Sequence, residues 1–124
     1  MKRLSAETVM ALHRELIEQS GGINGVRDFN LLDSSVNSPF HTYDGQYLYP
    51  TLQSMAAHLS FSIIKNHPFL DGNKRIGILS MLVFLELNGL PITCTDDELA
   101  SLGWGLADSS ISESNLIDWI ISHS

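Results

Sequence analysis

Nine consecutive residues of this chain combine a proton acceptor, a carboxylate, an amide and two cations. They read His-Pro-Phe-Leu-Asp-Gly-Asn-Lys-Arg over residues 67–75, directly before a strongly apolar stretch. A glycine turn that leads into a helix directs unpaired backbone N–H groups and the positive end of the helix dipole toward one place. The sequence therefore predicts an anion site here, with a phosphate group as its natural occupant.

Lys74 and Arg75 give the strongest local argument, because they stand at the start of the predicted helix. A cation at this end is unfavourable by a few tenths to about 1 kcal/mol unless an anion lies beside it. A bound phosphate group would remove that cost. The structural alternative is that the two cations pair with acidic side chains such as Asp71.

His67 and Asp71 supply two further groups that phosphoryl chemistry needs. A neutral His67 imidazole could accept the proton of an incoming hydroxyl, which typically contributes ~10²–10⁴-fold to a rate. Asp71 could hold Mg²⁺, a cation that prefers hard oxygen ligands and keeps most of its waters. Both have structural alternatives, because a histidine can complement the C-terminal end of a helix and Asp-Gly is a common turn. Gly72 would let a phosphate approach the backbone, but glycine serves any turn.

The rest of the composition excludes several classes of site. Phe69 is expected to lie buried beneath the loop and to fix it. The other four histidines and Cys94 show no metal-ligand spacing, so no zinc site is predicted. Seven basic and fourteen acidic residues give a formal charge of −7, which argues against a nucleic-acid partner because that requires a basic face.

Length and hydropathy favour one cytoplasmic domain spanning residues 1–124. The longest apolar run, Ile76 to Leu87, falls short of the ~20 residues that a membrane span needs. Met1 is not followed by the apolar core of a signal peptide, and a lone cysteine cannot form an internal disulfide. We therefore expect neither a membrane partner nor an oxidising compartment.

The periodicity of apolar residues predicts an all-α fold of about six helices. The expected helices run from the cap Ser5 to about residue 20, over 30–37, from Pro50 to 67, over 73–88, from the Thr95 capping box through 102, and onward from Ser112. The fourth is apolar on nearly every side, so we expect it to be central and fully surrounded. Asp44-Gly45 lies between aromatic residues of the segment 40–49, which predicts a small β-hairpin that could form an exposed flap.

Residues 67–75 resemble the signature of the Fic-domain proteins, and most closely that of their Doc (death on curing) branch. Ala11-Leu12-His13 and Gly21-Gly22 are also similar to Doc proteins. The resemblance implies a Fic/Doc-like helical bundle. It also implies that the hairpin over residues 40–49 is a docking flap, which holds the segment to be modified by main-chain pairing.

The resemblance assigns a function to each polar position of the loop. It implies that His67 is the general base, that Asp71 is the Mg²⁺ ligand, and that the phosphates of ATP are bound by Gly72, Asn73, Lys74 and Arg75. Fic proteins generally have glycine where this chain has Lys74, and they transfer AMP to a target hydroxyl. The lysine of Doc-like proteins implies the opposite orientation of ATP and transfer of its γ-phosphate to a Ser or Thr hydroxyl.

Physical reasoning agrees with this distinction, because a long cation would fill an anion hole but can neutralise a transferred phosphoryl group. The Fic pattern usually adds a second arginine soon after Arg75, whereas this chain continues with Ile76-Gly77-Ile78. That departure further weakens the AMP-transfer interpretation.

The resemblance finally implies a toxin of a toxin–antitoxin pair that acts on translation elongation factor Tu. Its implied partner is a small antitoxin whose helix lies in a groove of the toxin. Two alternatives remain open at this point. The chain could be an AMP transferase that uses the same base and Mg²⁺ ligand, or a non-catalytic module whose loop binds an anion or a partner's carboxylate.

Overall fold

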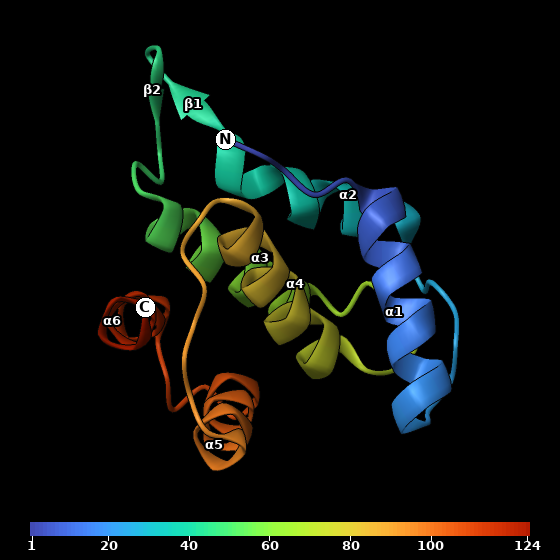
Figure 1. The fold of residues 1–124 in the computed structure, drawn as a ribbon. Coiled ribbons are helices and arrows are strands. Elements are labelled where there is room, and N and C mark those ends of the chain that lie inside the picture. The colour runs from blue at the N-terminus through green and yellow to red at the C-terminus, as the bar shows by residue number, and fades with distance from the viewer.

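The computed structural model describes residues 1–124 and consists of six α-helices, one 3₁₀ turn and one β-hairpin (Figure 1). The helical elements are α1 (Ala6–Ser20), α2 (Phe29–Asn37), η1 (Ser38–Phe40), α3 (Leu52–Asn66), α4 (Asn73–Leu87), α5 (Asp96–Ala107) and α6 (Glu113–His123). The predicted all-α class with a small hairpin is confirmed. None of these helices combines the length and the apolar character that crossing a bilayer requires.

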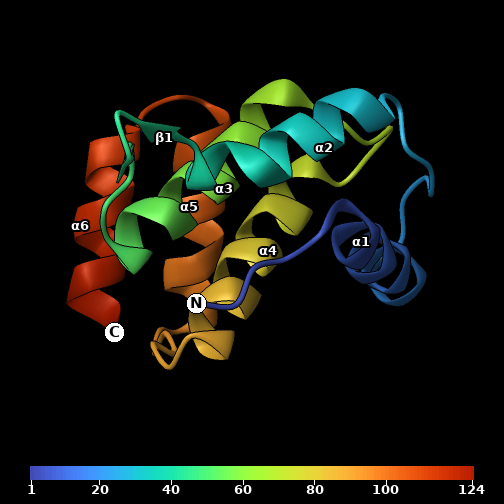
Figure 2. The same ribbon diagram turned by 90° about the horizontal axis from the view of Figure 1, so that it is seen from above.

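Helices α3 and α4 form the centre of the bundle and make the most extensive contact in the molecule. Helix α1 contacts α4 on one side, while α5 and α6 lie on the opposite side and α2 runs along α3 (Figure 2). Gly77 allows the two central helices to approach closely, because a Cβ at this position would lie 2.6 Å from Cγ1 of Ile64. The buried apolar residues, apart from Ile17, form one continuous core around this pair.

Two details differ from the sequence-based expectation. Helix α4 is central but not fully surrounded, since Leu79 and Leu82 are only partly buried and line a groove between α1, α4 and α5. Pro50 lies just before the N-cap of α3 rather than in its first turn. The cap is Thr51, whose side chain accepts a hydrogen bond from the Ser54 N–H, while the Ser54 hydroxyl accepts one from the Thr51 N–H.

The hairpin pairs β1 (Thr42–Tyr43) with β2 (Gln46–Tyr47) in antiparallel register. Its turn residues Asp44 and Gly45 have φ values of 52° and 76°, as a tight two-residue hairpin turn requires. The hairpin projects from the helices at the top of Figure 1, and Tyr43 is 78% exposed. The predicted hairpin at this position is confirmed.

Among the six α-helices, one begins differently from the other five. Five helices start with a side chain that accepts a hydrogen bond from the first turn, and these N-caps are Ser5, Asp28, Thr51, Thr95 and Ser112. Helix α4 instead follows Gly72, which has a φ of 75° and no side chain to act as a cap. The first N–H groups of α4 are therefore left for another acceptor.

Candidate active site

His67 ends α3 in a left-handed conformation, with φ 49° and ψ 57°, and its side chain is exposed. The carbonyl groups at this helix end are bound by Arg27, which donates from Nε to the His67 oxygen at 2.6 Å and from Nη2 to the Asn66 oxygen at 2.9 Å. Because Arg27 already complements the negative end of α3, His67 is not needed for that structural role. Its imidazole is free to act on a ligand.

Asn73 fixes the shape of the loop from inside. Its side-chain oxygen accepts a hydrogen bond from the Phe69 N–H and its amide donates to the Phe69 carbonyl, both at 3.0 Å. The same amide nitrogen lies 3.4 Å from Nδ1 of His67, which is too long to fix the tautomer of the ring. The side chain of Asn73 is thus committed to the loop, while its backbone N–H at the start of α4 remains available to an anion.

Phe69 and His13 form the floor beneath the loop. Phe69 is only 1% exposed, as the sequence predicted, and its ring stacks on His13 with the centroids 3.9 Å apart. Nε2 of His13 lies 2.7 Å from the Asp71 carbonyl oxygen and donates to it. Sequence reasoning missed this support, because His13 sits on the buried stripe of α1 with Val9 and Ile17 and only the tertiary fold brings it to the loop.

Both carboxylate oxygens of Asp71 accept backbone hydrogen bonds, from the Ile23 N–H at 3.0 Å and from the Gly72 N–H at 2.8 Å. The Ile23 bond and then the Gly72 bond lower the pKa of this carboxyl below its usual value. Each oxygen keeps a lone pair, and the side chain is 43% exposed. An exposed carboxylate of this kind suits Mg²⁺, whose remaining ligands would be phosphate and water oxygens.

The two cations of the loop behave differently. Arg75 donates from Nη1 to the Ser20 hydroxyl at 2.6 Å and to the Gly21 carbonyl at 2.9 Å, and its Nη2 lies 4.0 Å from Asp71. The side chain of Lys74 makes no hydrogen bond or ion pair with the protein, and its ammonium lies 3.8 Å from the ring centre of Trp104. The structural alternative, pairing with Asp71, therefore describes Arg75 but not Lys74.

The α1–α2 loop, residues 21–28, braces the candidate site from the outside. Besides its bonds to Asp71 and Arg75, it pairs with residues 68–70. Val26 and Phe69 form an isolated antiparallel bridge, and the Leu70 N–H donates to the Gly25 carbonyl at 3.1 Å. The backbone of residues 67–75 is held in place on this side by a segment that sequence reasoning did not connect with it.

All six predicted site residues line one open pocket of about 420 Å³. Its complete lining is His67, Leu70, Asp71, Gly72, Asn73, Lys74, Arg75 and Ala107. The pocket combines a proton acceptor, an ionised carboxylate, an uncapped helix start and an unpaired ammonium group. This arrangement can bind a phosphate group beside a base, which is what transfer to a hydroxyl requires.

Comparisons with known proteins agree with this geometry. A model of the Fic/DOC family matches residues 3–85, which includes the whole loop. The chain is 40% identical over 77 residues to "Toxin Doc" of Mycolicibacterium smegmatis, a match that covers 62% of this chain and 59% of that toxin. It is 30% identical over 118 residues to "Protein kinase doc" of Escherichia phage P1, covering 95% of this chain and 92% of the relative. The chain belongs to the Fic/DOC family.

Proposed function

We propose that this chain is a Doc-type toxin, a single domain over residues 1–124 that transfers the γ-phosphate of ATP to a Ser or Thr hydroxyl of a target protein. The proposed target is translation elongation factor Tu, so the chain would act in the cytoplasm and inhibit translation. The single observation that carries the proposal is the unpaired Lys74 ammonium at an uncapped helix start, beside an exposed His67. The printed names of the relatives, a Doc toxin and a Doc protein kinase, support the same reaction class.

In this proposal His67 acts as the general base. It removes the proton of the target hydroxyl as the hydroxyl oxygen attacks the γ-phosphorus, and the bond from that phosphorus to the β–γ bridging oxygen breaks. ADP leaves with the electron pair of that bond. Lys74 and the first N–H groups of α4 stabilise the negative charge on the transferred phosphoryl group.

Asp71 is the residue that would hold Mg²⁺. Its lowered pKa keeps it ionised at neutral pH, and its exposed oxygens are the hard ligands this cation prefers. Bound Mg²⁺ supplies charge neutralisation and alignment for the phosphates of ATP. Arg75, which contacts the C-terminal end of α1, contributes mainly by holding Asp71 and the α1–α2 loop in place.

The partner in this proposal is an antitoxin helix that occupies the groove between α1, α4 and α5. This groove has a volume of about 440 Å³ and an apolar floor that includes Leu16, Ile78, Leu82 and Leu99. An amphipathic helix can lay its apolar face into such a surface. Lys74 lines both the groove and the site pocket, so a helix seated there would lie beside the phosphate site.

The experiment that tests the reaction uses ATP labelled on either the γ- or the α-phosphate. Purified wild-type chain and the His67→Ala variant are incubated with Mg²⁺ and a translation extract, and labelled proteins are separated and identified. We expect γ-label on a protein in the extract, with elongation factor Tu as its carrier. Loss of the base should reduce the rate by ~10²–10⁴-fold.

Label position distinguishes the alternatives. Transfer of the α-label that depends on His67 would contradict the kinase proposal and make the chain an AMP transferase. Absence of both labels, together with growth arrest that persists in cells expressing His67→Ala, would favour a non-catalytic binding module. A separate binding measurement with purified elongation factor Tu identifies the target independently of the reaction.

A further inference from the structure

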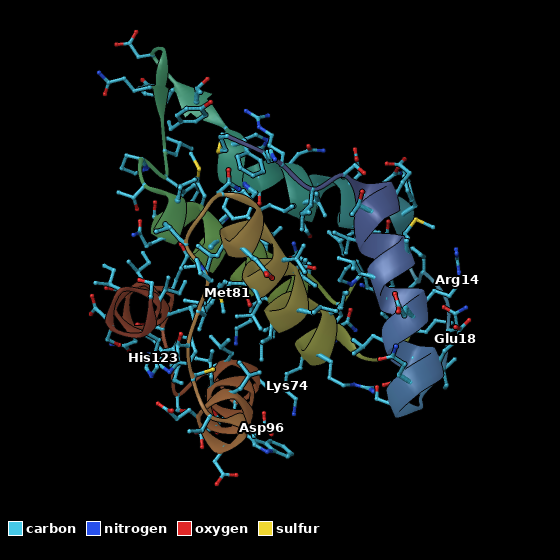
Figure 3. All side chains as sticks on the ribbon, in the orientation of Figure 1. Arg14, Glu18, Lys74, Met81, Asp96 and His123 are labelled. Carbon is cyan, nitrogen blue, oxygen red and sulfur yellow. The ribbon has the colours of Figure 1, made fainter.

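Trp104 is an exposed aromatic residue whose position neither the core nor a capping requirement explains. It lies on α5, its side chain is 67% exposed, and its ring face lies 3.8 Å from the ammonium of Lys74. Figure 3 shows Lys74 reaching from α4 toward α5. An indole ring is the strongest aromatic partner for a cation, and here it is the only partner that the Lys74 ammonium has.

Gly103, the neighbour of Trp104, lies beside the stem of the same lysine. A Cβ on Gly103 would lie 3.4 Å from Cδ and 3.6 Å from Cγ of Lys74. These are ordinary van der Waals distances, and the tightest neighbour of that Cβ would be Cδ1 of Ile78 at 3.1 Å, so the methylene chain of Lys74 passes directly beside Gly103. Two adjacent residues of α5 therefore accommodate Lys74, one along its stem and one at its charged end.

We propose that Trp104 and Gly103 form a cradle on α5 that positions the Lys74 ammonium for phosphate. The indole holds the cation without neutralising it, because the ring offers a face and not a counter-charge. A carboxylate in the same place would compete with the phosphates for Lys74. Trp104 is accordingly a positioning residue that acts through Lys74, and this inference rests on the proposed use of Lys74 as a phosphate ligand.

The test compares wild-type chain with Trp104→Leu, which removes the aromatic face, and Trp104→Phe, which keeps a weaker one. NMR of lysine-labelled protein measures the shift of the Lys74 ε-methylene protons, which the indole ring moves upfield. We expect this shift in wild type, part of it in Trp104→Phe and none in Trp104→Leu. Because Trp104 is exposed, the thermal unfolding midpoint should stay unchanged, and Trp119→Phe serves as the control for replacing a tryptophan elsewhere.

Binding is measured with two probes, ATP and inorganic tripolyphosphate, which carries the phosphates without a base. Trp104→Leu should weaken both by the same factor, about two- to fivefold, with Trp104→Phe between it and wild type. The kcat for phosphoryl transfer should fall in the same order. Rescue by phenylalanine distinguishes positioning by an aromatic face from a general effect on packing.

Three results would overturn the cradle. One is a Lys74 signal without an aromatic shift in wild type. Another is a loss of affinity for ATP but not for tripolyphosphate, which would show that Trp104 stacks on the base. The third is unchanged binding of both probes by Trp104→Leu, which would leave Trp104 only a contact for a partner. If wild type transfers no phosphate but Trp104→Leu still weakens tripolyphosphate binding, the proposed kinase function fails and the cradle is supported.

Discussion

Among single residues, Lys74 separates the two reactions that this loop could support. We expect Lys74→Gly to lower γ-phosphate transfer by about 10²–10³-fold, because a preorganised charge at the transferred group is lost. Opening the space at the helix start should at the same time favour transfer of AMP. Lys74→Met is the matched control, since it removes the charge but keeps the stem, and should lose γ-transfer without gaining AMP transfer. The products are identified by mass spectrometry of the modified target, and an unchanged product in Lys74→Gly would contradict the argument.

The residues of the loop could be predicted because they are contiguous. A nine-residue stretch that ends one helix and begins the next brings its own polar groups together by local geometry, and all of its polar residues line one pocket, namely His67, Asp71, Asn73, Lys74 and Arg75. His13, Arg27 and Trp104 could not be found in this way, because they reach the loop from other helices and loops. The sequence also could not show that Arg75 is bound by the protein while the Lys74 ammonium has no counter-charge. The difference depends on the C-terminal end of α1, which supplies the hydrogen-bond acceptors for Arg75.

Between elements, the contact of α3 with α4 positions the two ends of the loop. We expect Gly77→Ala to destabilise the fold by about 1–3 kcal/mol through overpacking, although alanine alone favours a helix by about 1 kcal/mol over glycine. The new Cβ would lie 2.6 Å from Cγ1 of Ile64 and 3.2 Å from the Ser60 carbonyl oxygen, so the helices would have to separate. Urea unfolding followed by circular dichroism measures the effect. A more stable variant would show that the helices can shift without cost.

The helices themselves were predictable to the extent that their signals are local. The Thr95 capping box is present with both of its hydrogen bonds, and α5 continues through Gly103 and Gly105 to Ala107 because packing outweighs the weak propensity of glycine. The open face of α4 was not predictable. Apolar residues such as Leu79 and Leu82 look the same in sequence whether they line a core or a groove.

For the whole molecule, the ion pair between Glu98 of α5 and His123 of α6 makes the free energy of unfolding depend on pH. Trp119 and then Glu98 raise the pKa of His123 above its ordinary 6.5, and the Thr95 N–H and then His123 lower the pKa of Glu98 below 4.5. The contribution of His123 is complete below pH 6.5 and is lost as pH rises through its folded-state pKa, whereas that of Glu98 is complete above 4.5 and is lost in acid. This ion pair, 2.8 Å long, thus stabilises the fold most between pH 4.5 and 6.5.

The measurement is the free energy of unfolding of wild type and His123→Gln across pH 3–9. In the variant, the decline of stability just above pH 6.5 should be reduced. The decline in acid should persist, because the Thr95 backbone bond is the larger cause of the Glu98 shift and Asp71 also has a lowered pKa. An equally steep decline of the unfolding free energy in both proteins just above pH 6.5 would contradict this assignment.

The hydrogen bonds from the α1–α2 loop to the site residues affect when the site forms during folding. The bonds to Asp71 and Arg75 join residues 48 and 54 positions apart in the chain, whereas each helix forms from near neighbours. Closing so long a segment carries an entropic cost before any contact offsets it. We therefore expect the site to assemble late in folding, so that a newly made chain with its helices in place would not yet hold the loop in the geometry that the proposed reaction needs.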